Sequence, residues 1–328
     1  MSGVLVVRPS SLGDVVHALA LVSDVERHCP EFAVDWVAEE AYAPLVRLDP
    51  RIRRVIPLAL RRWRRTPLAR ETRREFAVFR ADLRRDSYCA ILDLQEQIKG
   101  AVVARMARGL RHGFDRASIR EPVASLLDDV HHRVARELHF LDRCRALAGA
   151  ALGYAAEGSP LWRISTPPDA AAMPACPYVI AFHATSRSDK LWPEESWRHL
   201  LAHLASAGFA VLLPSGNADE AARSRRIAQG SDKSIALGAQ TVPELASLIR
   251  HAHLAVGVDT GLTHLAAALG TPTVSLFTST DPARAGVARI GAHARDLGGK
   301  GNVPTPADAF DVARVLMRPP PRHLSTPT

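Results

Sequence analysis

The sequence predicts an α/β protein with two Rossmann-like domains, each a doubly wound parallel sheet, that face a central cleft. Short apolar runs alternate with helix-like segments through both halves of the chain, which is the βαβ rhythm of such sheets. In each half one apolar run leads into a small-residue turn that opens a helix: residues 4–7 lead into 8–14, and residues 254–258 lead into 259–264. Open α/β sheets bind ligands at such strand ends, where helix N-termini offer free N–H groups to phosphate. Two turns of this kind predict two sheets that face one cleft.

The first half contains short apolar runs separated by longer segments with helical character. Strands are expected at residues 4–7, 33–37, 54–56 and 89–92, and helices at residues 11–28, 41–48, 70–84, 98–108 and 120–150. Because helices separate most of these runs, the strands are expected to pair in parallel.

A Pro- and Ala-rich stretch over residues 165–177 is typical of a linker and places the domain boundary. We expect an N-terminal domain at residues 1–168, a C-terminal domain at residues 169–315, and a flexible tail at residues 316–328, which holds three consecutive prolines. The rhythm restarts in the second half, with strands expected at 178–182, 210–213, 234–237, 254–258 and 273–277 and helices at 194–207, 218–229, 242–251 and 263–269.

Composition excludes several classes of protein. A chain of 328 residues with 47% hydrophobic and 23% charged residues is long and apolar enough for two globular domains, which excludes disorder as the default. The four cysteines are scattered without CxxC spacing, so we expect reduced thiols in a cytoplasmic protein and no structural zinc. No apolar stretch approaches the ~20 residues that span a bilayer, and the N-terminus does not resemble a secretion signal.

The net charge points to an anionic partner. A formal charge of +8 suits nucleic acid, an anionic membrane surface or a phosphorylated substrate, and charge alone does not choose among them. The basic residues are 38 arginines and only four lysines. A lysine kept in such a chain is a candidate for a compact point charge, which favours Lys99 and Lys190.

An arginine-rich stretch begins at Arg61 and runs to Arg85, with ten arginines against three acidic residues. Arginine forks grip phosphate or carboxylate in pairs of hydrogen bonds, and the indole of Trp63 suits an apolar or membrane surface. A solvated helix face explains the stretch equally well. Nucleic acid is a rival ligand, but no zinc-finger or RRM-type signature accompanies the stretch.

Asp14 follows the first strand, where a carboxylate facing the cleft can act as a general base. The spacing of Ser11 and Asp14 also fits a capping box, in which Asp14 only supports the start of the helix. Spacing alone slightly favours the cap.

Two segments of the second half are candidates for phosphate binding. Residues 185–195 join a strand to a helix, so their hydroxyls, their N–H groups and Lys190 could converge on a diphosphate; Pro193 before acidic residues is also an ordinary helix start. In residues 259–264, the N–H groups of Thr260 and Gly261 can point at phosphate, and Asp259 can orient hydroxyls. A lone histidine such as His264 is more often structural.

Together these blocks resemble glycosyltransferase family 9, the lipopolysaccharide heptosyltransferases. The resemblance keeps its order and spacing over nearly the whole chain, and colinearity is more specific than any one motif. It is carried by residues 10–15, 35–40, 54–57, 61–64, 120–125, 183–185, 189–195 and 258–264.

The resemblance implies a GT-B fold whose N-terminal domain takes the acceptor and whose C-terminal domain takes the nucleotide sugar. It implies an inverting transfer of heptose from ADP-L-glycero-β-D-manno-heptose to a Kdo residue of Kdo2-lipid A, with metal-independent donor binding and no cofactor. The enzyme is then expected in the cytoplasm, at the inner face of the inner membrane, with no nucleic-acid partner. Two alternatives remain: a related enzyme with a heptose acceptor, and a non-catalytic module that binds polyanions.

Site residues follow from the resemblance position by position. Asp14 matches the catalytic base and Lys190 a group that stabilises the leaving diphosphate. The donor set comprises Ser11, Gly13, Thr185, Ser186, Lys190, Glu220, Asp259, Thr260, Gly261 and His264, with Thr185 matched to phosphate and Glu220 to ribose. The acceptor set comprises Arg61, Arg62, Arg64, Arg65 and Arg120.

The chain departs from the family pattern at two positions. Glu96 follows Gln95 where relatives have glycine, and Ser215 stands beside Gly216 where close relatives have tryptophan. The first change is expected to reshape the acceptor pocket and the second the wall against adenine.

Overall fold

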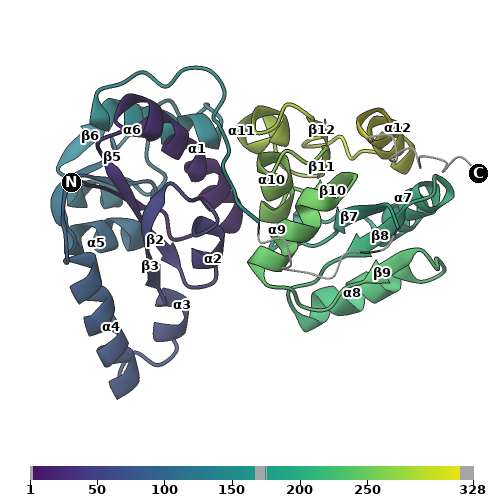
Figure 1. Ribbon diagram of the computed structural model, residues 1–328, viewed down its shortest axis with the longest axis horizontal. Helices are drawn as coiled ribbons and strands as arrows, with labels where there is room; N and C mark the ends of the chain where they lie inside the picture. Colours follow the sequence, from purple (N-terminus) through teal and green to yellow (C-terminus); the bar gives the residue numbers. More distant parts are fainter. Residues whose placement is uncertain (1–2, 167–173, 175, 318–328) are drawn as a thin grey trace, which may run out of the picture. The chain divides into compact units, whose positions relative to one another are not determined.

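The computed structural model describes residues 3–166, 174 and 176–317, and the chain divides into two compact units, Met1–Ser165 and Thr166–Thr328 (Figure 1). The expected domain boundary between residues 168 and 169 lies outside the described residues. So does most of the expected tail, residues 318–328. The last helix continues through Leu316, the first residue of the segment expected to be flexible.

The first unit is built on a six-stranded sheet with the order β3-β2-β1-β4-β5-β6, and every pairing in it is parallel. Its strands are β1 (Gly3–Val7), β2 (Ala33–Glu39), β3 (Ile52–Leu58), β4 (Ser87–Asp93), β5 (Arg108–Phe114) and β6 (Val130–His132). Its helices are α1 (Leu12–His28), α2 (Ala43–Val46), α3 (Leu60–Trp63), α4 (Arg70–Leu83), α5 (Ile98–Met106), the 3₁₀ helix η1 (Pro122–Leu127) and α6 (Phe140–Leu152).

The second unit repeats this plan with a parallel sheet in the order β12-β11-β10-β7-β8-β9. Its strands are β7 (Tyr178–Phe182), β8 (Ala210–Leu213), β9 (Ser234–Ala236), β10 (Leu254–Val258), β11 (Thr273–Phe277) and β12 (Ala294–Gly298). Its helices are η2 (Ser188–Lys190), α7 (Glu194–Ser206), α8 (Ala218–Ala228), α9 (Val242–His251), α10 (Gly261–Ala268), α11 (Pro282–Ala285), η3 (Val287–Arg289) and α12 (Pro306–Leu316).

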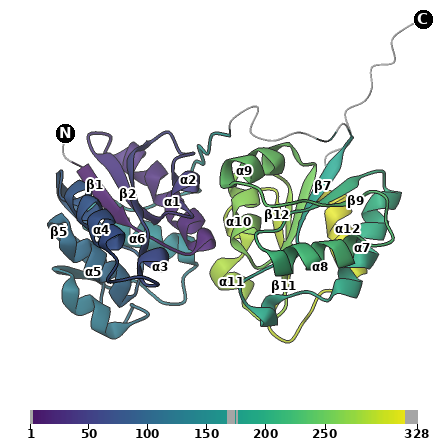
Figure 2. The same ribbon diagram turned by 90° about the horizontal axis from the view of Figure 1, so that it is seen from below.

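Both sheets have the same topology, because strands counted within each unit fall in the order 3-2-1-4-5-6. The order reverses between β1 and β4 in the first unit and between β7 and β10 in the second, and Figure 2 shows each sheet between layers of helices. The carboxyl ends of these strand pairs are the switch points at which open α/β sheets bind ligands. The expected pair of doubly wound α/β sheets is confirmed.

The helical expectation for residues 120–150 is wrong over its first half. There the chain forms η1 and the edge strand β6, and α6 begins only at Phe140. Pro122 opens η1, and the three-residue strand β6 is too short to leave a hydrophobic pattern.

Strands β5 and β12 and helix α12 were not expected either. β5 reads Arg-Gly-Leu-Arg-His-Gly-Phe and lacks the apolar run of a buried strand.

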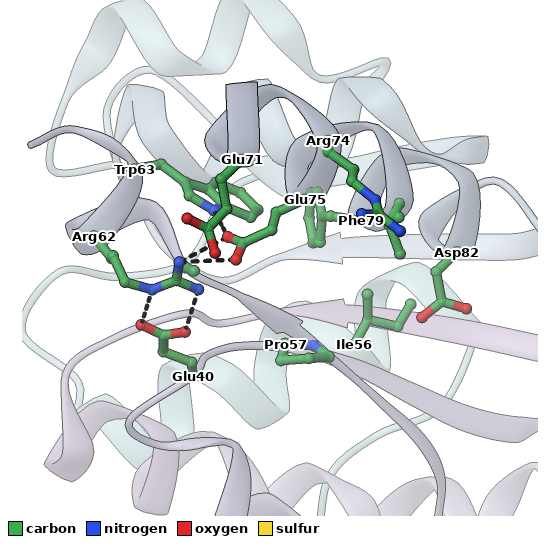
Figure 3. A pocket seen from close by; sticks show the side chains of 12 residues that line it. Glu40, Ile56, Pro57, Arg62, Trp63, Glu71, Arg74, Glu75, Phe79 and Asp82 are labelled. Carbon is green, nitrogen blue, oxygen red and sulfur yellow. Dashed lines mark hydrogen bonds and ion pairs between the residues drawn. The ribbon is translucent and has the colours of Figure 1, made fainter. Parts of the chain in front are cut away.

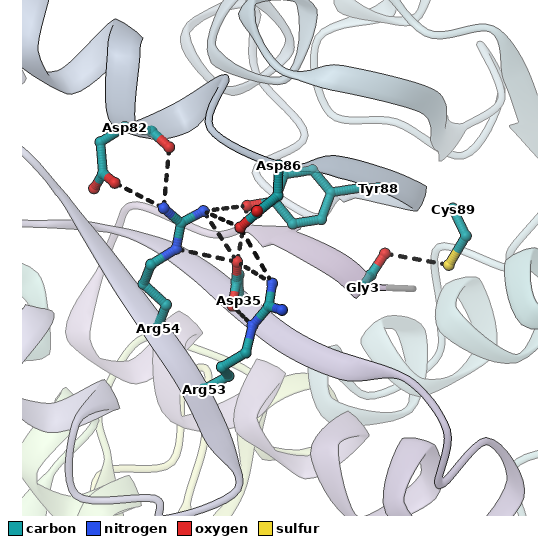
Figure 4. A network of polar contacts seen from close by, with 8 residues as sticks. All are labelled: Gly3, Asp35, Arg53, Arg54, Asp82, Asp86, Tyr88 and Cys89. Atoms are coloured by element: carbon teal, nitrogen blue, oxygen red, sulfur yellow. Dashed lines mark hydrogen bonds and ion pairs between the residues drawn. The ribbon is translucent and has the colours of Figure 1, made fainter. Parts of the chain in front are cut away.

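Apolar strands and buried ion pairs hold the first unit together. Strands β1 and β4 share a core with α3, α4 and α5, in which Trp63 packs edge-on against Phe76 and Phe79. Near the sheet, the buried Asp35 carboxylate accepts hydrogen bonds from Arg53, Arg54 and Tyr88 (Figure 4). Burial alone would raise the pKa of Asp35, but these donors lower it below its usual value. The carboxylate of Asp35 on β2 therefore joins this strand to the arginines of β3 and to Tyr88 of β4.

Within the described part of the chain, no helix combines the length and the apolar character needed to cross a membrane.

Candidate active site

The switch point of the first unit carries a paired carboxylate. Asp14 lies in the first turn of α1, directly after the turn that leaves β1. Its Oδ1 lies 2.9 Å from Nη2 of Arg8, and its Oδ2 accepts from the N–H and the hydroxyl of Ser11, both at 2.8 Å. Asp14 therefore forms the capping box with Ser11 through Oδ2. Its other oxygen, Oδ1, pairs with Arg8. Gly13 beside Asp14 is buried, and Ser11 is exposed.

The surroundings keep Asp14 ionised. Burial raises the pKa of its carboxyl, but the charge of Arg8 and the hydrogen bonds from Ser11 outweigh burial and lower the pKa below the usual value. Arg8 is itself buried, and burial lowers the pKa of its guanidinium. The charge of Asp14 raises this pKa, and the net effect of the surroundings is a raised pKa. The pair thus places one negative and one positive charge at the end of β1.

The loop after β4 supports the turn after β1. Oε1 of Gln95 accepts from the N–H of Ser10 at 3.1 Å, and Nζ of Lys99 donates to the Ser10 hydroxyl at 3.0 Å. Burial lowers the pKa of Lys99, and the nearby charges of Arg61 and Arg8 lower it further. Lys99 stood out in the sequence as a rare lysine, yet the motifs did not assign it to the site.

A buried acid lies at the end of β4. Oδ1 of Asp93 accepts from the N–H of Gln95 at 2.9 Å. Within the described residues its Oδ2 is buried and has no hydrogen-bond partner. Burial and the nearby Asp128 raise the pKa of Asp93 to about 8. Asp93 is therefore largely neutral at pH 7 and adds little negative charge at the end of β4.

Glu96 adopts a backbone conformation that suits glycine. Its φ is +60°, in the left-handed region. Its carboxylate oxygen Oε2 lies 2.8 Å from Nη2 of Arg143, whose guanidinium also donates to backbone carbonyls and lies 4.7 Å from the ring centre of Phe114. The departure from glycine in this chain therefore brings a counter-charge to a buried arginine.

The five predicted acceptor arginines differ in how they are held. Arg61 lies over the ring of Tyr42, with 5.3 Å from Cζ to the ring centre, and Nη2 donates to the Tyr42 hydroxyl. Arg62 is already paired with Glu40 and Glu75 (Figure 3). Arg64, Arg65 and Arg120 are exposed. The role of these five arginines in acceptor binding stays a prediction.

A cavity of about 430 Å³ lies beside Arg62, between α4 and the end of β3 (Figure 3). Ile56, Pro57 and Phe79 give it apolar walls, and charged side chains surround them. Trp63 also lines the cavity but is only 7% exposed, and its indole N–H donates to Oε2 of Glu75 at 2.6 Å. The indole is therefore part of the unit's own core and is not free to lie on a membrane.

The switch point of the second unit is centred on Asp259, the first residue after β10. Its Oδ2 lies 2.6 Å from Nζ of Lys190 and accepts from the hydroxyl of Thr280 at 2.7 Å. The hydroxyl of Thr185 donates to its backbone carbonyl at 3.2 Å. Three segments far apart in the sequence thus meet at one carboxylate.

Helix α10 begins directly beside this carboxylate. Thr260 is its N-cap and Gly261 its first residue, so the N–H groups of Thr260, Gly261 and Leu262 have no acceptor within the helix and can bind an anion. The preceding strand needs glycine at Gly257, because a Cβ there would collide with the Thr263 side chain. His264 is buried, with its Nε2 3.7 Å from Oδ1 of Asp259.

The other predicted donor residues are placed less centrally. Ser186 is exposed after β7. Glu220 accepts from the N–H of Gly216 at 2.7 Å and from the side-chain amide of Asn217 at 2.9 Å, so both of its oxygens already cap the start of α8. Ser215 donates to the carbonyl of Leu237 at 2.9 Å, and its effect on the expected wall against adenine stays a prediction.

The loop after β11 belongs to the same group, although the sequence motifs missed it. Besides Thr280, the hydroxyl of Thr278 donates to the backbone carbonyl of Asp189 at 2.9 Å, and that of Ser279 donates to its carboxylate at 3.0 Å. A Thr-Ser-Thr run directly after the apolar residues 273–277 was the available signal. The loop fixes the segment that carries Lys190.

Comparisons with known proteins point to one protein family. The model of "Glycosyltransferase family 9 (heptosyltransferase)" matches residues 76–300. Lipopolysaccharide heptosyltransferase 1 of Escherichia coli K12 is 37% identical over 287 residues, which cover 85% of this chain and 88% of the relative. The protein of the same name from Pseudomonas aeruginosa PAO1 is 37% identical over 281 residues, covering 85% and 79%.

Two solved structures have the same fold over nearly their whole length. E. coli heptosyltransferase WaaC with ADP superposes with a TM-score of 0.85 at 34% identity, covering 96% of this chain and 98% of that one. WaaC with ADP-2-deoxy-2-fluoro heptose gives a TM-score of 0.82 at 33% identity, covering 95% and 99%.

Proposed function

The chain belongs to glycosyltransferase family 9, the heptosyltransferases, and we propose that it moves L-glycero-D-manno-heptose from ADP-L-glycero-β-D-manno-heptose to a Kdo residue of Kdo2-lipid A. The donor assignment is supported by the similar structures that hold ADP and a fluorinated ADP-heptose. The acceptor assignment is supported by the relatives named lipopolysaccharide heptosyltransferase 1.

In this proposal Asp14 is the base. Its carboxylate takes the proton of an acceptor hydroxyl as that oxygen bonds to the anomeric carbon, and the bond from this carbon to the diphosphate oxygen breaks on the opposite side. The configuration inverts. Because the pKa of Asp14 is lowered, the carboxylate is ready without first losing a proton. The hydroxyl becomes acidic enough to protonate it only as the new C–O bond forms, so proton transfer accompanies attack.

The leaving ADP gains negative charge, and the second unit supplies the groups that stabilise it. Lys190 provides an ammonium held in place by Asp259, and the N–H groups of Thr260 and Gly261 provide donors at a helix N-terminus. These fixed donors are the observation that carries the proposal. They lie at a switch point and match the charge of a diphosphate.

We also propose that the protein works in the cytoplasm, at the inner face of the inner membrane. A lipid-linked acceptor requires access to a bilayer, and the formal charge of +8 favours an anionic surface.

The test is ADP release by the purified protein with ADP-heptose and either Kdo2-lipid A or an acceptor that already carries one heptose. Release with the first acceptor alone supports the proposal. Release with the second alone would assign the alternative acceptor. No release with either, together with tight binding of an oligonucleotide, would point to a non-catalytic polyanion-binding module.

The arginines provide a second arm of this test. Replacing Arg61 and Arg64 with alanine is expected to raise KM for the acceptor and reduce its salt dependence, while KM for ADP-heptose stays unchanged. An equal rise in both KM values would contradict a separate acceptor site.

A further inference from the structure

Helix α4 separates its charges by sign around the helix axis. Thr72, Phe79 and Leu83 mark its buried side. At 3.6 residues per turn, Glu71, Glu75 and Asp82 fall on one flank, where they line the cavity of Figure 3. The arginines take the outer face and the opposite flank: Arg70, Arg73, Arg74 and Arg80.

Two of the three acidic side chains on this flank are paired inside the unit. Glu75 pairs with Arg62 at 2.8 Å, and Asp82 pairs with Arg54 at 2.7 Å. Within the described residues, no ion pair joins a carboxylate to any of the four outer arginines, all of which are exposed. The outer face of α4 therefore carries a concentrated positive charge that the unit itself does not balance.

Exposed apolar side chains lie beside two of these arginines, Arg73 and Arg74. Leu68, just before the helix, is 82% exposed, and its carbonyl accepts from Nη2 of Arg73 at 3.0 Å. Val78 is 63% exposed and follows Arg74 by four residues, so the two are neighbours on the helix surface, and both also line the cavity beside Arg62. A solvated arginine face gains nothing from a leucine and a valine in water. Basic and apolar side chains on one face are typical of helices that lie at a membrane interface.

We propose that Leu68, Arg70, Arg73, Arg74, Val78 and Arg80 form a surface, here called the α4 docking surface, that binds the anionic phospholipid headgroups of a bilayer. The arginines bind the phosphates, and Leu68 and Val78 enter the boundary between headgroups and acyl chains. The inference rests on the proposed function only in that a lipid-linked acceptor gives such docking a purpose.

The same observations favour lipid over nucleic acid. Single-stranded nucleic acid is bound by basic grooves that also offer aromatic rings for base stacking. Here the indole of Trp63 is buried, and Phe76 packs against Trp63 and Phe79. Phe76 is still 41% exposed, but the most exposed apolar side chains beside the arginines, Leu68 at 82% and Val78 at 63%, are aliphatic, which suits acyl chains better than bases.

The test is co-sedimentation of the full chain with vesicles of phosphatidylcholine, with or without phosphatidylglycerol. Wild type is expected to bind the mixed vesicles and to release them as salt rises. Changing Arg70, Arg73 and Arg80 together to glutamine is expected to weaken this binding roughly 100-fold, because each arginine near an anionic surface contributes about 1 kcal/mol. The pair Leu68→Ser and Val78→Ser is expected to weaken it with less effect on the salt dependence.

Matched controls come from the second unit. The exposed arginines Arg198, Arg225 and Arg314, changed together to glutamine, remove the same charge, and Val315→Ser removes an apolar side chain that is 82% exposed. The controls and wild type are compared at a salt concentration that screens the effect of the lost net charge. There the controls are expected to bind within about twofold of wild type. Equal weakening by controls and docking variants would overturn the proposal and assign binding to net charge.

ADP release with a deacylated, water-soluble Kdo acceptor separates this proposal from the proposed function. The docking variants are expected to keep wild-type rates with that acceptor, because they change no residue assigned to catalysis or substrate binding. A protein that releases ADP but does not bind the mixed vesicles would refute docking alone. Binding to neutral vesicles as strong as to anionic ones, or preference for a single-stranded oligonucleotide over anionic vesicles, would also refute it.

Discussion

Replacing Glu96 with glycine tests how this chain balances a strained residue against a buried charge. The change removes a non-glycine residue from the left-handed region, where φ is +60°, and this relief is worth about 1 kcal/mol. It also removes the carboxylate that lies 2.8 Å from Nη2 of Arg143. Side-chain exposure is only 2% at Arg143 and 14% at Glu96, so the guanidinium would keep its charge without its counter-charge.

The loss of the pair should outweigh the relief of strain. Removing one partner of a buried ion pair costs about 3 to 5 kcal/mol. The lower end applies here, because Arg143 keeps the carbonyls of Ala135 and Ser118 as acceptors and the ring of Phe114 beside it. A gain of about 1 kcal/mol against a loss of about 3 leaves Glu96→Gly destabilised by about 2 kcal/mol.

The assay is urea unfolding of the full chain, read from hydrogen exchange of peptides in the first unit so that the second unit does not enter the result. A cycle with Arg143→Met separates the two effects. In that background there is no guanidinium to leave unpaired, so Glu96→Gly should stabilise by about 1 kcal/mol. A stabilising Glu96→Gly in the wild-type background, or the same sign in both, would refute this reasoning.

Three further changes test the site. Asp14→Asn should lower kcat roughly 100-fold or more with ADP affinity unchanged, measured by ADP release and calorimetry; an active variant would leave Asp14 as a helix cap. Lys190→Met should weaken ADP binding and lower kcat together, since in the proposed mechanism the ammonium contacts both the bound and the leaving diphosphate; unchanged ADP affinity would remove Lys190 from the donor site. Asp93→Asn should stabilise the protein more at pH 9 than at pH 5. The raised pKa of Asp93, about 8, means that the wild type loses stability as pH rises from its unfolded pKa near ~4 through 8, and the amide does not ionise. Parallel pH curves for the two proteins would contradict this assignment.

The sequence reveals the central strands because burial on both faces requires an unbroken apolar run. β1, β7 and β10 are buried along their whole length, and the turns after β1 and β10 are rich in small residues. Edge strands are not under this constraint. β6 and β9 have three residues each and expose part of their surface, and β12 is only partly buried after its first residue. β9 was expected from its position in the rhythm, whereas β6 and β12 left no pattern to detect.

Strand register explains which site residues the motifs missed. In the first sheet Val7 pairs with Asp93, so the turn after β1 runs beside the loop after β4, and Ser10 meets Gln95 and Lys99. These contacts join residues more than 80 positions apart, and neither segment indicates the pairing by itself. In the second sheet Val258 pairs with Leu276, which brings Thr280 to Asp259 in the same way.

The remaining hydrogen-bonding capacity at the two switch points shows how each can take a ligand without losing the partner that orients it. An ammonium has three N–H donors, so Lys190 can keep its contact with Asp259 and still offer two donors to a diphosphate. A carboxylate has about four acceptor positions, and Asp14 uses two on Oδ2 for Ser11 and one on Oδ1 for Arg8. The free position is on Oδ1. The acceptor proton should therefore pass to the oxygen that faces Arg8, while Oδ2 continues to hold the start of α1.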